Sequence, residues 1–344
     1  MNPSQVAGIT PIPTIETIAD CAPGQIPDAL LAAKKPVVLK GLVKHWPVVK
    51  AAAHSAERAF EHICGFYNHE LVNTAIGNSD NEGAIFYNED LSGFTYQRQR
   101  THLNKVLEHI RALESAGSAQ AYYVDSVPVD FCLPGFRAHN DLDWQQRNPR
   151  VSIWMGNKTR VSIHHDIPDN IACVVTGKRR FTLFPPEQLP NLYIGPLDFN
   201  PAGPAISMVD LHNPDWEKFP RFREALAHAR MAELEPGDAI FIPSLWWHQV
   251  DGLESFNVLV NYWWSQSPDY LGSPLDAFNH ALMNIKTLPE EERRYWKAIF
   301  DHYIFAGDAD TFAHIPAHRL GVLGPFDEPM ARRMRSLLLG RLNR

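Results

Sequence analysis

The chain has 344 residues, of which 45% are hydrophobic and 21% charged, as is typical of a soluble globular protein with a sizeable core. A formal net charge of −7 argues against a general nucleic-acid binder, although it leaves room for a local basic groove. The four cysteines lie far apart without a C-x-x-C pair, no apolar stretch reaches 18 residues, and no apolar run follows a basic start. We therefore expect no zinc knuckle, disulfide framework or membrane span, and a cytoplasmic location.

Residues 1–120 are predicted to form helices and strands that pack on a central domain. In chain order, the first elements are a helix over 26–33, a strand over 36–42, a helix from the N-cap Ser55 to Cys64, and strands over 70–76 and 84–87. Residues 101–117 place apolar side chains at helical spacing, which predicts an amphipathic helix that covers a sheet.

Residues 121–265 are predicted to form the central β domain. Its expected strands are 122–124, 151–156, 161–166, 171–176, 179–184, 239–242 and 256–264. Short strands at roughly ten-residue spacing, with turn residues between them, indicate an all-β sandwich or barrel. A Pro- and Asn-rich insertion between 189 and 228 ends in a short helix over 220–230, and loops of that length are usually functional or serve as a cover.

Residues 266–344 return to a helical pattern and form a predicted C-terminal extension. The helical stretches are 274–285, 289–299 and 330–342. The last one and its flank carry arginines without an acid, at Arg332, Arg333, Arg335, Arg341 and Arg344. We expect an amphipathic helix that packs on the barrel or on a second subunit, with binding of an anionic partner as the alternative.

The expected strand 161–166 carries the feature on which the functional interpretation depends. Residues of equal parity share one face of a strand, so His164 and Asp166 point the same way and His165 points the other way. A histidine and a carboxylate two positions apart can bind one metal ion. A distant His248 completes the two-histidine, one-carboxylate triad that holds Fe(II) and leaves three coordination positions open.

The alternative to a metal site is chance. An H-x-D triplet is a weak signal alone, and His248 follows Trp246 and Trp247 on a turn, where a histidine is more often a core residue. Both features occur in one β domain, which favours the metal ligands. We therefore expect an iron-dependent oxygenase with His164, Asp166 and His248 at its catalytic centre.

The strand 179–184 predicts an anion site. Its odd positions are mostly apolar and should face inward, which takes Arg179 with them, whereas Arg180 and Thr182 should face solvent. A buried arginine needs an anion, because an unpaired interior charge is very costly. Arg179 is therefore expected to hold the far carboxylate of an organic diacid. A snorkelling arginine or an internal carboxylate pair is the alternative.

The strand 256–264 separates an apolar face from a polar one. Its even positions are apolar or aromatic and need a covering helix, while the odd positions include Asn257, Asn261 and Trp263. Asparagines that face a barrel interior need hydrogen-bond partners, and a polar lumen beside a metal supplies them. The alternative is that these asparagines satisfy buried backbone groups.

Four separated motifs occur in the order found in a known family. They are the run 164–170, the segment 177–186, the segment 236–248 from Pro-Gly-Asp to Trp-Trp-His, and Asn261-Tyr262-Trp263. Over about residues 35–265 the chain resembles the cupin-like JmjC hydroxylases, with a pattern most similar to the asparaginyl hydroxylase that inhibits hypoxia-inducible factor. The resemblance implies a mainly β fold with flanking helices, the double-stranded β-helix of cupins and jelly rolls. It also implies Fe(II) as cofactor and 2-oxoglutarate as cosubstrate.

The resemblance also implies roles for individual residues. Iron binding falls to His164, Asp166 and His248, cosubstrate contacts to Asn170, Asn261 and Tyr123, and a position near the substrate to Trp263. The chain departs from the family at Arg179, where the family has a lysine. Arginine offers a carboxylate a bidentate fork, so we expect function to survive.

The implied activity is hydroxylation of a protein side chain or a small molecule. The alternatives are a cupin enzyme that uses the metal without 2-oxoglutarate, and a binding module without turnover that holds a metal and a carboxylate. By family analogy, the C-terminal helices suggest a homodimer. A nucleic-acid partner is unlikely on charge, and no membrane partner is expected.

Overall fold

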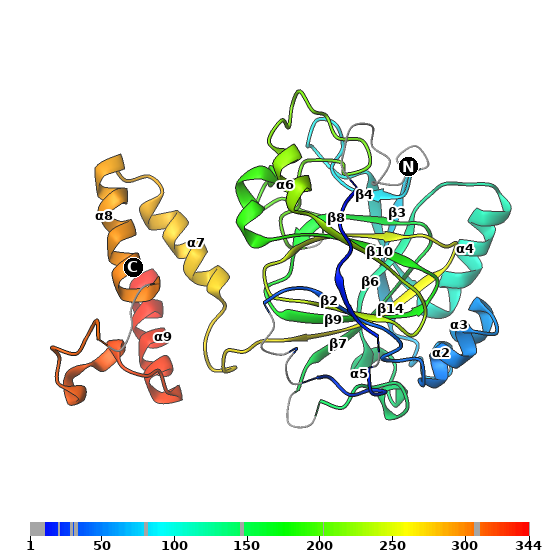
Figure 1. The fold of residues 1–344 in the computed structure, drawn as a ribbon, viewed down its shortest axis with the longest axis horizontal. Helices are drawn as coiled ribbons and strands as arrows, with labels where there is room; N and C mark the ends of the chain where they lie inside the picture. The colour runs from blue at the N-terminus through cyan, green and yellow to red at the C-terminus, as the bar shows by residue number, and fades with distance from the viewer. Residues whose placement is uncertain are drawn as a thin grey trace. The chain divides into compact units, whose positions relative to one another are not determined.

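The computed structural model describes residues 11–19, 21–27, 30, 34–78, 82–144, 148–201, 203–305 and 310–343. The chain divides into two units, Met1–Ser265 and Gln266–Arg344, each described here by itself (Figure 1). Most of the helix expected over residues 26–33 lies outside the described residues.

Two β-sheets form the first unit. The larger has the order β1 (Glu16–Ile18), β2 (Val37–Leu39), β12 (Ala239–Ile242), β9 (Asp169–Thr176), β14 (Asn257–Trp264), β7 (Arg150–Gly156), β6 (Tyr122–Pro128), β3 (Leu71–Gly77) and β5 (Tyr96–His102). The smaller has the order β11 (Arg230–Leu234), β10 (Arg179–Phe184), β13 (Trp247–Gly252), β8 (Arg160–His165) and β4 (Ala84–Ile85). One apolar cluster joins Val174 and Ile240 of the larger sheet to Phe181 and Leu183 of the smaller. The two sheets therefore enclose a core between them, and the expected jelly-roll fold is confirmed.

The N-terminal strands are built into the two sheets: β1, β2, β3 and β5 into the larger, and β4 into the smaller. Strand β2 pairs with β12, and β3 pairs with both β6 and β5. Strand β5 was not expected, because its sequence YQRQRTH lacks an apolar face. Since β5 extends to His102, the helix predicted from 101 begins later, as the 3-10 turn η3 (Leu103–Lys105) and helix α4 (Val106–Ser115).

Helices cover the outer face of the larger sheet. Helices α2 (Pro47–Ala52), α3 (Ala56–Cys64) and α4 share an apolar cluster with the even positions of β14, as the sequence predicted. The predicted N-cap of α3 is confirmed, because the Ser55 side chain accepts a hydrogen bond of 3.2 Å from the Arg58 backbone N–H. The short helix α5 (Val129–Cys132) follows β6.

The outer face of the smaller sheet is covered by the long insertion and by helix α6 (Phe222–His228), whose Phe222 packs with Phe184 and Trp247. The expectation that Arg180 and Thr182 face solvent was therefore wrong, since both are buried. Both side chains do point away from the core, but the insertion and helix α6 cover this face of the sheet.

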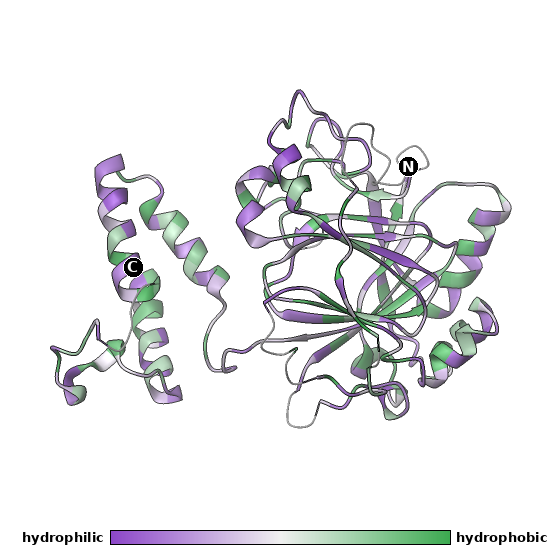
Figure 2. Ribbon diagram, viewed as in Figure 1, coloured by the Kyte–Doolittle hydropathy of each residue, from purple (hydrophilic) through white to green (hydrophobic). Residues whose placement is uncertain are grey.

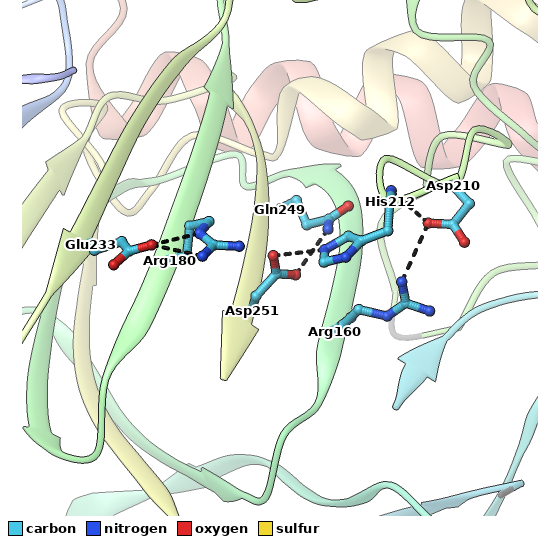
Figure 3. A network of polar contacts seen from close by, with 7 residues as sticks. All are labelled: Arg160, Arg180, Asp210, His212, Glu233, Gln249 and Asp251. Carbon is cyan, nitrogen blue, oxygen red and sulfur yellow. Dashed lines mark hydrogen bonds and ion pairs between the residues drawn. The ribbon is translucent and has the colours of Figure 1, made fainter. Parts of the chain in front are cut away.

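A network of polar side chains lies under this cover (Figure 3). His212 from the insertion is 2.9 Å from Asp251, whose other carboxylate oxygen accepts a 2.9 Å hydrogen bond from Gln249. Arg180 donates two hydrogen bonds, of 2.9 and 2.7 Å, to Glu233 on β11. The insertion is thus tied to the sheet by charged groups that satisfy one another. We call this set, with Arg160 and Asp210, the outer network.

The second unit consists of helices α7 (Pro274–Ile285), α8 (Glu290–Phe300) and α9 (Glu328–Leu342), with the shorter turns η6 (Asp301–Phe305), η7 (Ala317–Arg319) and η8 (Gly321–Leu323). These positions agree with the helical stretches expected from the sequence. Among the described residues of α7, α8 and α9, only Ala331 is buried, although all three helices carry hydrophobic residues (Figure 2). In the part of the chain that the structure describes, no helix is both long and apolar enough to cross a bilayer.

Candidate metal centre

The three predicted metal ligands meet at one end of the smaller sheet. His164 on β8 and His248 on β13 are directly paired across the two strands, and their ring centroids are 4.3 Å apart. Asp166 follows the end of β8, and its Oδ2 lies 3.6 Å from Nε2 of His248. One ligand atom from each residue lies within 4.8 Å of the other two. Side chains 82 positions apart in sequence therefore converge on a point where one cation fits.

Two neighbouring expectations have different outcomes. His165 points away from the cluster, as parity predicted, and its ring packs edge-on against Trp247 at 4.4 Å. His248 was expected on a turn, but it is the second residue of strand β13. The two tryptophans before it concealed the strand, because they belong to different environments: Trp246 packs in the inner core and Trp247 on the outer face.

Backbone carbonyls fix both histidine rings. Nδ1 of His164 lies 2.8 Å from the Ser162 carbonyl, and Nδ1 of His248 lies 3.0 Å from the Trp246 carbonyl. These hydrogen bonds place the proton on Nδ1 and leave Nε2 as the lone-pair donor, which is the arrangement of metal-binding histidines. Burial, reinforced by the nearby His164, lowers the pKa of His248. His248 is therefore neutral near pH 7 and able to bind a metal.

Asp166 is oriented by a chain of hydrogen bonds. Its Oδ2 accepts from Trp263 Nε1 at 3.1 Å and from Asn170 Nδ2 at 3.4 Å. Asn170 Oδ1 in turn accepts from Asn261 Nδ2 at 3.3 Å, and Asn261 Oδ1 accepts from Trp154 Nε1 at 2.7 Å. Sequence reasoning selected all of these residues except Trp154. The alternation of 151–156 could have indicated Trp154, because its even face lies opposite Asn261.

The other asparagine of β14, Asn257, hydrogen-bonds to backbone groups, which is the alternative that the sequence left open. Asn257 Nδ2 donates to the backbone carbonyls of Asn157 and Glu254, at 3.1 and 2.7 Å. It therefore closes a turn at the strand start, whereas Asn261 belongs to the site.

A cavity of about 350 Å³ opens beside the three ligands. All the other predicted site residues line it: Tyr123, Asn170, Arg179, Asn261 and Trp263. Sequence analysis missed several further lining residues, which include Arg98, Asp125, Arg150 and Trp154, together with Pro201, Pro204 and Ile206 of the insertion.

Arg179 is the most unusual group in this cavity. Its side chain is 3% exposed, and its Nε has no hydrogen-bond partner. Burial lowers the pKa of Arg179, and the neighbouring Tyr123 hydroxyl offsets part of that effect. Among the described residues no carboxylate forms an ion pair with Arg179, so neither alternative raised by the sequence, a snorkelling side chain or an internal acid pair, fits the structure. Lys178 faces outward as predicted, with its Nζ 2.7 Å from Glu235.

Comparison with known proteins agrees with this geometry. The cupin-like domain family matches residues 23–270. The chain belongs to that family. More specifically, it carries a cupin-like domain of the JmjC type, within a family that includes Fe(II)/2-oxoglutarate oxygenases.

Three relatives illustrate the range of this family. The chain is 36% identical over 129 residues to lysine-specific demethylase JMJ31 of Arabidopsis thaliana, covering 36% of this chain and 23% of that protein. It is 32% identical over 148 residues to tRNA wybutosine-synthesizing protein 5 of Gallus gallus, covering 39% and 43%. It is 32% identical over 147 residues to human HSPB1-associated protein 1, covering 42% and 30%. The chain thus spans less than half the length of each relative.

Proposed function

We propose that this protein is an Fe(II)- and 2-oxoglutarate-dependent oxygenase that hydroxylates a protein side chain or a small molecule. The observation that carries the proposal is the cavity itself. One cavity holds a His-Asp-His cluster and, separately, the buried guanidinium of Arg179, which has no carboxylate partner among the described residues.

The residues present fit a divalent transition metal. Two imidazoles with fixed tautomers and one carboxylate form a two-histidine, one-carboxylate set, the donor combination typical of non-haem Fe(II) sites. Zinc is also compatible with these donors, but the unpaired Arg179 favours a site that receives a dianionic cosubstrate. When bound, Fe(II) together with 2-oxoglutarate supplies the oxidation of a substrate C–H bond by O2.

The residues also fit 2-oxoglutarate. A carboxylate on Arg179 satisfies the unpartnered Nε and neutralises a buried charge. Burial raises the pKa of Tyr123, so its hydroxyl stays protonated and can donate a hydrogen bond to the same carboxylate. Asn170 and Asn261 keep Asp166 in place and offer amide groups along the cavity between the two ends.

The protein's own contribution is positioning and exclusion of water. The Trp263 and Asn170 hydrogen bonds hold the carboxylate of Asp166 in one orientation. The insertion closes one side of the cavity, because the Pro201 carbonyl accepts hydrogen bonds from Tyr96, at 2.6 Å, and from Arg98. A preorganised and shielded site of this kind suits a reaction whose reactive stage must not meet stray water.

Release of labelled CO2 tests the proposal. Purified protein is incubated in air with Fe(II) and 1-[14C]-2-oxoglutarate, with no substrate added, and the Asp166→Ala variant serves as control. We expect slow release by the natural protein and none by the variant.

A second candidate is a cupin that holds a metal and a carboxylate without consuming 2-oxoglutarate. The replacement of the family's lysine by Arg179 is the observation that favours it. Binding of 2-oxoglutarate or another dicarboxylate without CO2 release, either alone or with a screen of candidate substrates, would support this second function.

We also propose that the second unit pairs with a second copy of the chain. Apolar side chains that lie exposed on its helices include Leu275, Phe278, Met283, Trp296, Ile299, Leu339 and Leu342. Exposed apolar surface on this scale marks a protein contact. Helix α8 begins with three glutamates and α9 is rich in arginine, so two copies related by a twofold axis can bring opposite charges together.

Sedimentation equilibrium tests this pairing. Glutamate at both Leu339 and Leu342 should turn a dimer into a monomer. Glutamate at Leu189 and Leu197, which are similarly exposed leucines of the first unit, should leave the dimer intact. A monomeric natural protein would overturn the pairing.

A further inference from the structure

One arginine in the reaction cavity has no function in the site described above. Arg150 begins strand β7, lines the cavity, and lies directly across from Trp263 in the pairing of β7 with β14. Its guanidinium carbon is 5.7 Å from the centroid of the Trp263 ring, within the range of a cation–π contact. The register of the sheet sets this stack, because directly opposed side chains on one face of a sheet are neighbours.

The stack connects Arg150 to the metal centre. The same Trp263 ring donates its N–H to Oδ2 of Asp166 at 3.1 Å. One face of the indole therefore lies under the guanidinium while its edge holds a metal ligand. A group that binds Arg150 is consequently held near the metal centre, because Trp263 contacts both Arg150 and the ligand Asp166.

Arg150 is also the unpaired charge at the open end of the cavity. It is exposed, and no ion pair joins it to any residue that the structure describes. The other arginine at this end, Arg98, lies 3.7 Å from Asp125. These two groups offset one another, which leaves Arg150 without an acid.

The position of Asp125 reinforces this contrast. The pairing of β6 with β7 shifts register between Val124 and Val127, and Ser126 within that bulge has a φ of 37°. Bulges beside active sites commonly redirect a side chain, and this one places Asp125 in the cavity. Burial raises the pKa of Asp125, and Arg98 opposes that shift. Among the described residues, an acid therefore lies beside Arg98, and none forms an ion pair with Arg150.

The charge balance of the cavity indicates that an anion would pair with Arg150. Its charged lining consists of Arg98, Arg150 and Arg179 against Asp125 and Asp166, apart from the two ligand histidines. A divalent metal and a dianionic cosubstrate cancel each other. The loaded cavity therefore keeps one positive charge, and Arg150 is the residue that carries it.

We propose that Arg150, in cation–π contact with Trp263, binds a carboxylate of the substrate and so selects substrates with an acidic group near the carbon that reacts. This inference rests on the proposed oxygenase function and adds the substrate class. A guanidinium offers a carboxylate two parallel hydrogen bonds. The chain's net charge of −7 argues against the phosphates of a nucleic acid as the source of the anion. An acidic protein side chain and a small carboxylic acid share the required chemistry.

Proton relaxation on the metal-loaded protein tests the proposal without turnover. The protein is loaded with Mn(II) and saturated with N-oxalylglycine, a 2-oxoglutarate analogue with an N–H in place of one CH2, so that Arg179 is occupied. Capped aspartate and capped glutamate are then titrated against their neutral amide counterparts, capped asparagine and capped glutamine. Paramagnetic relaxation of the probe protons reports binding near the metal.

We expect the acidic probes to be relaxed more strongly than the neutral ones, and Arg150→Gln to weaken their binding about tenfold. Arg100→Gln is the matched control, because Arg100 is an exposed arginine on β5 that bonds the Leu71 carbonyl and does not line the cavity. It should change nothing. A longer acidic peptide that binds much more tightly than the capped residues would identify a protein substrate, and equal binding would identify a small acid.

Two results would overturn the proposal: equal relaxation of acidic and neutral probes by the natural protein, or unchanged binding in Arg150→Gln. Failure of the underlying oxygenase function is distinguishable, because it appears as a lack of CO2 release from labelled 2-oxoglutarate, which the relaxation measurement does not require. The contrast between the natural protein and Arg150→Gln is measured in either case.

Discussion

The two faces of the strand pair β10 and β13 carry polar clusters of opposite character. On the inner face, Arg179 and His248 contribute to a set of groups that no described residue fully satisfies. On the outer face, Arg180 and Asp251 lie directly opposite each other, and each has a side-chain partner at hydrogen-bonding distance, Glu233 and His212 respectively. Both faces are buried, so burial does not distinguish them.

The two faces differ in whether their buried polar groups are paired, and this difference distinguishes a binding site from a structural contact. Buried polar groups in proteins are nearly always paired, because an unpaired one loses its hydration without compensation. Arg180 and Asp251 of the outer network follow that rule, and the bond from His212 to Asp251 helps to hold the insertion in place. The inner cluster does not follow it, because Arg179 and the metal-ligand atoms lack partners that a bound metal and a dicarboxylate would supply. Substitutions on the two faces should therefore have opposite consequences.

The largest expected effect is at the metal. Asp166→Ala removes one of three ligands, so affinity for Mn(II) or Fe(II) should fall by more than the roughly 10- to 100-fold loss typical of removing a group that only hydrogen-bonds to a ligand. Equilibrium dialysis measures this, and circular dichroism should show an unchanged fold. Trp263→Phe, which removes only a hydrogen bond to Asp166, should fall within the 10- to 100-fold range. Unchanged metal stoichiometry in Asp166→Ala would contradict the ligand assignment.

The next effect separates binding from stability. Arg179→Met should weaken 2-oxoglutarate binding roughly 100-fold, because it removes one partner of a buried ion pair. The same change should raise the free energy of unfolding of the ligand-free protein by about 1 kcal/mol, because an uncompensated buried charge is gone. Titration calorimetry and denaturant unfolding provide the two measurements.

Arg180→Met, one residue further on the outer face, is the matched control. It loses the Glu233 ion pair, so it should lower stability by about 0.5–1 kcal/mol and leave 2-oxoglutarate binding intact. If both arginine variants lost stability alike, the contrast between the faces would be wrong.

A smaller effect is expected within the outer network. His212→Ala leaves the 2% exposed Asp251 with Gln249 as its remaining side-chain hydrogen-bond partner among the described residues, so the free energy of unfolding should fall by about 1–3 kcal/mol. Metal affinity should not change. His228→Ala, on the exposed end of α6, should change stability by less than about 0.5 kcal/mol. A loss of metal affinity in His212→Ala would couple two clusters that the structure keeps apart.

Much of the inner face could be predicted from the sequence, because alternation along a strand determines which side chains share a face. That rule placed His164 with Asp166, turned His165 and Lys178 outward, and put Arg179 in the interior. The distant His248 was selected together with that strand, and the resemblance to the family implied the same assignment. Two of the cavity residues that were missed depend on irregularity: Asp125 lies on a bulge, and Arg98 lies on a strand without an apolar face.

The outer face could not be predicted in the same way. Arg180 and Thr182 have the composition of a solvent-facing row, and their burial depends on an insertion with no periodic pattern. Among its contacts with the sheet is His212, whose partner Asp251 lies 39 residues further along the chain. Parity predicts the direction of a side chain, but not which distant segment comes to lie over it.

The most direct test of one cavity with two binding ends is the affinity for 2-oxoglutarate measured by calorimetry with and without bound Mn(II). If the three ligands and Arg179 act on the same molecule, the metal should tighten 2-oxoglutarate binding by at least about tenfold. Arg179→Met should weaken binding in both conditions. Equal affinity for 2-oxoglutarate in the metal-free and the metal-loaded protein would contradict the account.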